Sequence, residues 1–212
     1  MEITILDRLI LLLVGLTAVY LTYRFYKDYN ENKPKSKQNI YYIVSFTVLF
    51  VSGVLIIFLG FDILKNPLIS IVATILPFGI ATGLIAQFYK KYEMPYLILM
   101  IIGLIAISLQ QFGVINMKMI YPVFHSIAGL TIFLVPIMSV KNKMANSNFI
   151  WVTVGGTIIG IGGIALAFLG AGKPLLGIFT AEVVFTILTP ILLLMALAFT
   201  FGFVKNIKHP VG

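Results

Sequence analysis

The chain has 212 residues, of which 60% are hydrophobic and 10% charged, and its net charge is +8. A soluble domain carries about 25% charged residues, and one core of this size could not bury so much apolar surface. We therefore predict a membrane protein, and the absence of cysteine excludes disulfides, thiolate metal sites and cysteine nucleophiles.

Seven apolar runs are long enough to cross a bilayer as helices, because a span needs about 20 residues. We predict an all-α, single-domain bundle of seven transmembrane helices in a cell membrane. The first run lacks a preceding basic segment and a small-residue cleavage pattern, so we expect a retained span rather than a signal peptide. The predicted spans are residues 6–26, 40–61, 67–89, 94–113, 118–140, 149–170 and 177–204.

The cations predict the orientation of these spans. Eleven of the fifteen lysines and arginines lie in segments that share one side, and short basic loops stay in the cytoplasm. We therefore expect the N-terminus outside and the C-terminus inside. The predicted inner cations are Arg24, Lys27, Lys33, Lys35, Lys37, Lys90, Lys91, Lys141, Lys143, Lys205 and Lys208, and the outer ones are Arg8, Lys65, Lys118 and Lys173.

Two outer turns resemble each other. FLGFDILKNPL, residues 58–68, is echoed by FLGAGKPLLG, residues 168–177, and ATILP at 73–77 is echoed by TILTP at 186–190. If the echoes are a duplication, spans one to three pair with spans five to seven, and span four connects them. Such a 3+1+3 parallel repeat is a known transporter plan. Chance matching between apolar sequences remains the alternative.

Ionisable groups within spans are the first candidates for function, because burying them in lipid is costly. His125 and Glu182 lie inside spans, toward the outer surface, with Asp62 and Tyr121 on the same side. A carboxylate near an imidazole would form a proton relay or cation site. The alternative is that Glu182 pairs with Lys173 and that His125 bonds a neighbouring helix.

Met117, Met119 and His125 form a weaker candidate site for copper, since thioethers and imidazole suit Cu(I). No other cofactor is predicted. The chain has no GxSxG, HExxH or phosphate-binding glycine loop. We therefore expect no catalysis by this chain alone, and the basic residues follow membrane topology rather than a nucleic-acid-binding pattern.

Small residues at helical spacing predict close helix contacts, because packing through small side chains drives helix association in lipid. They serve either a partner interface or packing within the bundle. A second set, of aromatic residues near the inner surface, predicts an anchoring belt at the headgroups. The small residues are Gly79, Gly83, Gly156, Gly160, Gly163 and Ala167. The predicted belt is Tyr20, Tyr23, Tyr26, Tyr41, Tyr42, Tyr89, Tyr92 and Trp151.

Three functions fit these features. The first is a non-catalytic accessory or scaffold subunit of a larger membrane complex, in contact with lipid and with other subunits or copies of itself. The second is a small-solute or cation/proton-coupled transporter with the 3+1+3 plan. The third is a seven-helix sensor with an outer ligand pocket.

Overall fold

The computed structural model describes residues 3–31, 35–117, 119–170, 177–178 and 180–208, and these residues form helices and connecting turns. The predicted all-helical fold is confirmed. The long helices are α1 (Ile5–Glu31), α2 (Gln38–Leu59), α3 (Pro67–Phe88), α4 (Glu93–Gln111), α5 (Ile120–Lys141), α6 (Ile150–Gly170) and α7 (Ala181–Lys208). Short 3-10 helices η1 (Phe61–Lys65), η2 (Lys90–Tyr92) and η3 (Ser147–Phe149) precede α3, α4 and α6.

Six of these helices are long and apolar enough to cross a membrane: α1 to α5 and α7. A shorter apolar stretch, Ser147–Gly163, covers η3 and most of α6. The chain is therefore a multi-pass membrane protein by the length and composition of its helices. A helix of 22 residues is about 33 Å long, slightly more than the hydrocarbon thickness of a bilayer.

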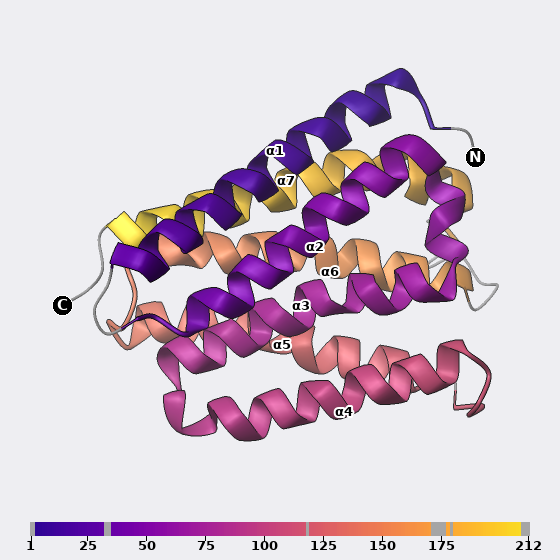
Figure 1. Ribbon diagram of the computed structural model, residues 1–212. Helices are drawn as coiled ribbons and strands as arrows, with labels where there is room; N and C mark the ends of the chain where they lie inside the picture. Colours follow the sequence, from indigo (N-terminus) through magenta and orange to yellow (C-terminus); the bar gives the residue numbers. More distant parts are fainter. Residues whose placement is uncertain (1–2, 32–34, 118, 171–176, 179, 209–212) are drawn as a thin grey trace.

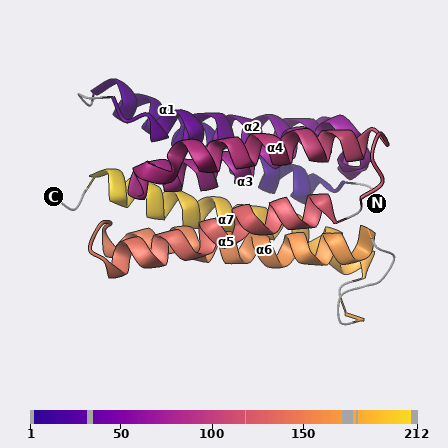
Figure 2. The ribbon, with the colours of Figure 1, turned by 90° about the horizontal axis from the view of Figure 1, so that it is seen from below.

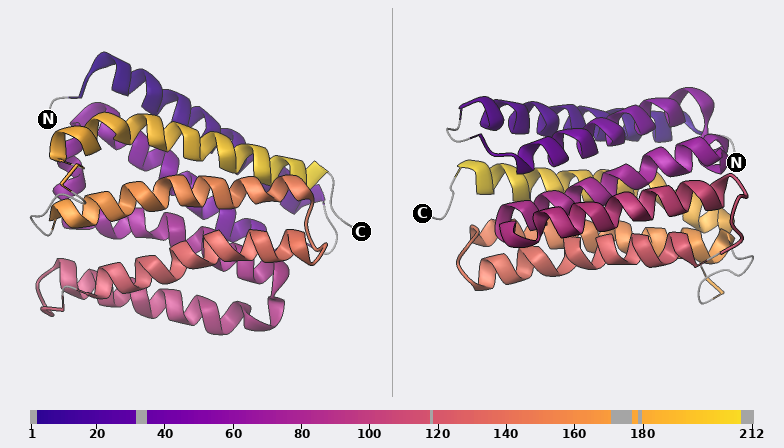
Figure 3. Two further views of the ribbon diagram at one scale, coloured as in Figure 1. Left: turned by 180° about the vertical axis from the view of Figure 1, so that it is seen from behind. Right: turned by 60° about the horizontal axis from the view of Figure 1, so that its bottom comes forward.

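Six helices form a closed ring, and α4 lies outside it. Around the ring, α1 packs on α2, α2 on α3, α3 on α5, α5 on α6, α6 on α7, and α7 closes onto α1. The helices form two layers, with α1, α2 and α3 facing α7, α6 and α5 (Figures 1 and 2). Figure 3 shows α4 at the edge of the bundle, where it packs on α3 and α5.

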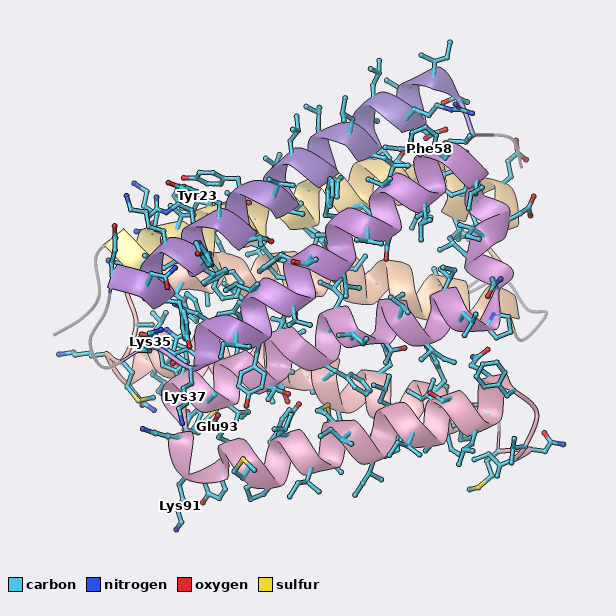
Figure 4. The ribbon with its side chains drawn as sticks, in the orientation of Figure 1. Tyr23, Lys35, Lys37, Phe58, Lys91 and Glu93 are labelled. Atoms are coloured by element: carbon cyan, nitrogen blue, oxygen red, sulfur yellow. The ribbon has the colours of Figure 1, made fainter. Side chains whose placement is uncertain are left out.

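Charge divides the bundle into two ends. Because successive helices run in opposite directions, the end of α1 meets the start of α2, and the same alternation continues to the end of α7. We call this the basic end. Figure 4 shows Lys35, Lys37 and Lys91 there, away from Phe58 at the opposite end. Its described basic residues are Arg24, Lys27, Lys35, Lys37, Lys90, Lys91, Lys141, Lys143 and Lys205.

An aromatic cluster fills the ring interior toward the basic end. Its members, none more than 2% exposed, are Phe25, Tyr42, Phe46, Phe149, Phe199 and Phe203. Phe203 of α7 is the hub, with five of these rings at centroid distances of 4.9 to 6.1 Å. Each such aromatic pair adds about 0.5–1.5 kcal/mol beyond the area that it buries. The cluster therefore joins α1, α2, η3 and α7 through side chains.

The structure corrects one member of the predicted aromatic belt. Tyr42 is 1% exposed and belongs to the aromatic cluster, where its hydroxyl donates to Gln87 Oε1 at 2.8 Å. Because the Tyr42 hydroxyl has a hydrogen-bond partner inside the protein, its ring does not have to lie at the lipid headgroups. Of the predicted belt, the exposed side chains are Tyr20, Tyr23, Tyr26, Tyr92 and Trp151.

Polar contacts tie neighbouring elements together at the basic end. The Tyr41 hydroxyl donates to Glu93 at 3.0 Å, which links α2 to α4. The Asn39 amide donates to Asp28 at 2.7 Å and joins the start of α2 to the end of α1. Each carboxylate thus accepts a bond from a neutral side chain of α2.

The turn between α2 and α3 has a well-defined backbone. Gly60 ends α2 with a positive φ of 75°, a conformation that favours glycine. Asn66 caps α3, since its side chain accepts a bond from the Leu68 amide at 2.9 Å, and Pro67 occupies the first turn. The echoed turn includes residues 171–176, which lie outside the described residues.

Candidate functional site

The candidate site lies between α3, α5 and α6, toward the end opposite the basic end. Tyr121 and His125 are one helical turn apart on α5, and their rings stack with centroids 5.6 Å apart and planes at 13°. The Tyr121 hydroxyl lies beside the side chain of Thr74, which is fully buried on α3. Thr74 also donates to the Ser70 carbonyl at 2.8 Å. The predicted candidates Tyr121 and His125 are therefore neighbours.

His125 has an unsatisfied nitrogen inside this site. Its Nδ1 is buried and has no hydrogen-bond partner among the described residues. Its Nε2 faces the backbone of α6, because a Cβ added to Gly163 would lie 3.6 Å from it. Leaving a buried polar atom unpaired costs about 1–3 kcal/mol. A water molecule or a small polar ligand that hydrogen-bonds to Nδ1 would remove that cost.

A second unsatisfied group belongs to α4. Gln110 lies in the last turn of this helix, and its Oε1 is buried without a hydrogen-bond partner in the described part of the chain. Gln110 lies at the same end of the bundle as His125, and α4 packs on α5. The opposite end therefore holds polar capacity that the described protein groups do not use.

A buried carboxylate at this end was not among the predicted site residues. Asp7, in the first turn of α1, is 9% exposed. Its Oδ2 accepts from the Thr4 amide and hydroxyl at 3.0 and 2.6 Å, and the Asp7 amide donates to Thr4 Oγ1 at 3.1 Å. This reciprocal pair is a capping box. The other oxygen, Oδ1, accepts from Thr189 of α7 at 2.7 Å, so Asp7 also closes the ring.

Glu182 does not lie beside His125. It is exposed in the first turn of α7, and α6 separates α7 from α5 among the described residues. Lys173, its alternative predicted partner, lies outside the described residues. Asp62 is exposed in η1, between α2 and α3. The described geometry brings Tyr121 and His125 together, and leaves Glu182 on a different helix.

The copper candidates occupy different surroundings. Met117 and Met119 are 61% and 67% exposed where the chain enters α5, whereas the His125 ring packs between Tyr121 and Gly163. Within the described residues, no three side chains of histidine, aspartate or glutamate gather as a metal site would require. The copper site stays a prediction from sequence.

The glycines on α3 face α2. A Cβ on Gly79 would collide with the Ser45 side chain, and one on Gly83 would lie 2.5 Å from the Tyr42 ring. α2 therefore needs glycine at both positions to approach so closely.

The predicted small residues of α6 differ in whether they contact another helix. A Cβ on Gly156 would lie 2.7 Å from Ile132 of α5, whereas Gly160 has nothing within 4 Å, and the side chain of Ala167 lies outside the described residues. Two contacts between α6 and α7 were not predicted: a Cβ on Gly155 would lie 2.6 Å from the Phe199 ring, and one on Gly202 2.9 Å from Val152. The presence of glycine in these two apolar helices could have suggested close contacts at both positions, but it does not indicate which residues they contact.

No protein-family model matches this chain, and neither the characterised proteins nor the solved structures contain a significant match.

Proposed function

We propose that this protein is a non-catalytic multi-pass subunit that organises a larger complex in a cell membrane. The observation that carries the proposal is the filled ring interior. The aromatic cluster occupies the ring toward the basic end, with ring centroids as close as 4.7 Å. A protein whose interior is committed to its own packing acts through its surface.

Three hydrogen bonds in the basic half support this proposal, because they tie α2 to its neighbouring helices. Gln87, Glu93 and Asp28 each accept a bond from a residue of α2. A buried polar group that already has its partner adds rigidity rather than chemistry. A rigid bundle is what an organising subunit requires.

Helix α4 offers the surface that such a subunit would use. It lies outside the ring, and a long apolar row along it is exposed: Ile98, Ile101, Ile102, Ile105 and Leu109. In a membrane this face could contact either lipid acyl chains or the apolar face of another helix, because acyl chains and apolar side chains have similar polarity.

The test is the state of the protein in native membranes. A photoreactive amino acid at Ile102, which is 53% exposed, is expected to give crosslinks to other polypeptides or to a second copy. The same group at Ile107, which is fully buried on the same helix, is the matched control and is expected to crosslink within the chain. Native mass measurement after gentle solubilisation is expected to give a mass above 23.5 kDa plus bound lipid. A bare monomer without crosslinks at Ile102 would contradict the proposal.

The finer topology belongs to the same proposal: seven spans, the basic end in the cytoplasm, and a 3+1+3 repeat. The order of helices in the ring is compatible with a two-fold axis that relates α1, α2 and α3 to α5, α6 and α7. Under this exchange, the contact between α1 and α7 becomes the contact between α5 and α3, and both contacts are present. Any ring of six successive helices has this property, so the ring order alone does not distinguish a repeat from chance. The orientation is supported separately, by the distribution of charge. Most of the described basic residues lie at one end, as cytoplasmic loops require, whereas Arg8 and Lys65 lie at the other.

A second candidate, a proton- or cation-coupled transporter, is favoured by the unsatisfied Nδ1 of His125 within a two-fold ring. In a transporter of the 3+1+3 kind, the solute path would run between the two sets of three helices. Flux into vesicles that contain the purified protein is the test. Flux that survives both His125→Ala and Glu182→Gln would remove this mechanism, and flux lost only in His125→Ala would support a site at α5.

A further inference from the structure

Two shallow grooves run along α1, one on each side of it. One lies between α1 and α2, and the other between α1 and α7. Leu13, Leu16, Thr17 and Tyr20 of α1 line the second groove, together with Leu193 and Leu197 of α7. Both helices are membrane-span candidates, so this groove faces the lipid. A lipid acyl chain fits such a groove, because most of the lining side chains are apolar.

A cation lies at the basic end of the α1–α7 groove. Arg24 is one helical turn beyond Tyr20, and its Nη1 donates to the Tyr20 hydroxyl at 3.4 Å. A guanidinium has five N–H donors, and this hydroxyl is its one acceptor among the described residues. Its Nε is buried without a partner. Most of the hydrogen-bonding capacity of Arg24 is therefore unused.

The carboxylates at this end do not neutralise Arg24. Asp28 is the next acid along α1, and it accepts its bond from Asn39. Glu31 pairs with Lys27 at 3.7 Å, and Glu93 accepts from Tyr41. In the described part of the chain, no carboxylate lies within 4 Å of Arg24. The groove therefore ends in a guanidinium without an ion pair among the described residues, one helical turn from the Asp28 carboxylate.

We propose that the α1–α7 groove binds an anionic phospholipid, with its phosphate at Arg24 and an acyl chain along Leu16 and Leu197. An arginine fork binds phosphate oxygens in pairs, which a lysine cannot do. The length also fits. Leu13 lies eleven residues before Arg24, about 16 Å along the helix, and one leaflet holds about half of the 30 Å hydrocarbon core.

The charge of the surroundings selects the lipid class. Lys205 of α7 also lies at the basic end, over the ring of Phe201. A headgroup with a net negative charge gains from each nearby cation, by about 1 kcal/mol for one lysine or arginine at a membrane surface. A zwitterionic headgroup would bring its own cation toward Arg24 and Lys205. The groove therefore favours phosphatidylglycerol or a similar lipid over phosphatidylcholine.

The experiment places a fluorescent reporter in the groove. Trp151 is the single tryptophan, so the protein with Trp151→Phe and Leu16→Trp carries one reporter, in the groove lining. It is reconstituted in vesicles that mix ordinary lipid with brominated phosphatidylglycerol or brominated phosphatidylcholine, which quench tryptophan on contact. The proposal predicts preferential quenching by the phosphatidylglycerol, about fivefold in relative association constant.

Matched variants identify the cause of this preference. Arg24→Gln is expected to lower it, and Arg24→Gln combined with Lys205→Gln to reduce it to about one. Arg8→Gln, which changes the same residue type at the far end of α1, is expected to leave it intact. A reporter at Ile102→Trp, exposed on α4, is expected to show no preference.

Each other outcome overturns the proposal. Equal quenching by the two lipids at the groove reporter would do so even if Arg24→Gln failed to fold. A preference that Arg24→Gln leaves unchanged would move the site elsewhere, and shielding of the groove reporter from both lipids would mean that a protein segment fills the groove.

Discussion

The two halves of the ring interior are built differently. Toward the basic end, stacked aromatic rings fill the space, and the Tyr42 hydroxyl has its partner in Gln87. Toward the opposite end, Asp7 is buried and bonded to Thr189, and the Nδ1 of His125 has no partner among the described groups. The first half therefore contains the aromatic packing of the ring. Polar atoms without a partner among the described residues occur in both halves, as Arg24 Nε shows toward the basic end and His125 Nδ1 toward the other.

The comparison predicts its largest effect at the hub of the aromatic cluster. Phe203→Ala would remove contacts with five rings and leave a cavity, which we expect to cost about 3–5 kcal/mol in the free energy of unfolding. Reversible unfolding in mixed micelles measures that value. The control is Phe58→Ala, because Phe58 is 77% exposed, and it should cost less than about 0.5 kcal/mol. Equal losses would contradict the division into halves.

A smaller loss is expected from crowding the interface between α2 and α3. Gly83→Ala would bring a Cβ to 2.5 Å from the buried Tyr42 ring, and overpacking of this kind costs about 1–3 kcal/mol. Gly160→Ala is the matched control, since nothing lies within 4 Å of that position. The same unfolding measurement compares them. If both substitutions were neutral, the close approach at Gly83 would not hold the bundle together.

In the opposite half, the bond that closes the ring should matter less. Thr189→Val removes the hydroxyl that donates to Asp7 at 2.7 Å, and we expect a loss of about 1 kcal/mol. Thr186→Val is the control, because its hydroxyl bonds only the Glu182 carbonyl within α7. The difference between the two unfolding free energies isolates the link from α7 to α1. A larger loss from Thr186→Val would contradict that role for Asp7.

The smallest effect is expected at the candidate site. His125→Leu replaces an imidazole whose Nδ1 has no partner, so the unfolding free energy should change by less than about 1 kcal/mol, toward greater stability. Tyr121→Phe is the companion variant, because it keeps the ring beside His125 and removes the hydroxyl beside Thr74. A loss well above 1 kcal/mol for His125→Leu would mean that the imidazole is satisfied and structural.

The sequence predicts the helices well and their arrangement poorly, for one physical reason. A span is marked by about 20 apolar residues, and hydropathy detects that signal directly. In lipid, however, the face toward other helices is as apolar as the face toward acyl chains. Nothing in α4 therefore marks it as the helix outside the ring. The C-terminal end of α1 also extends beyond the apolar run. The Lys27–Glu31 ion pair and the Asp28–Asn39 hydrogen bond stabilise the helix there, in polar sequence.

Two features that the sequence analysis missed, the Asp7 cap and the aromatic cluster, had signals that could have been used. Thr4 and Asp7 have the spacing of a capping box, which marks the start of α1 and brings the carboxylate back toward the chain. Tyr42 with Phe46, and Phe199 with Phe203, are aromatic pairs four residues apart, the spacing that puts side chains on one helix face. The bond from Thr189 to Asp7 spans 182 residues and had no local signal.

The most direct test of this account is the side of the membrane on which each end lies. The chain has no cysteine, so single cysteines can be placed without background. The account predicts that an impermeant maleimide labels Asn116→Cys, before α5, in intact cells, and labels Lys143→Cys, after α5, only once the cells are opened. Labelling of Lys143→Cys in intact cells, or the same pattern at both positions, would contradict a bundle that crosses the membrane with its basic end in the cytoplasm.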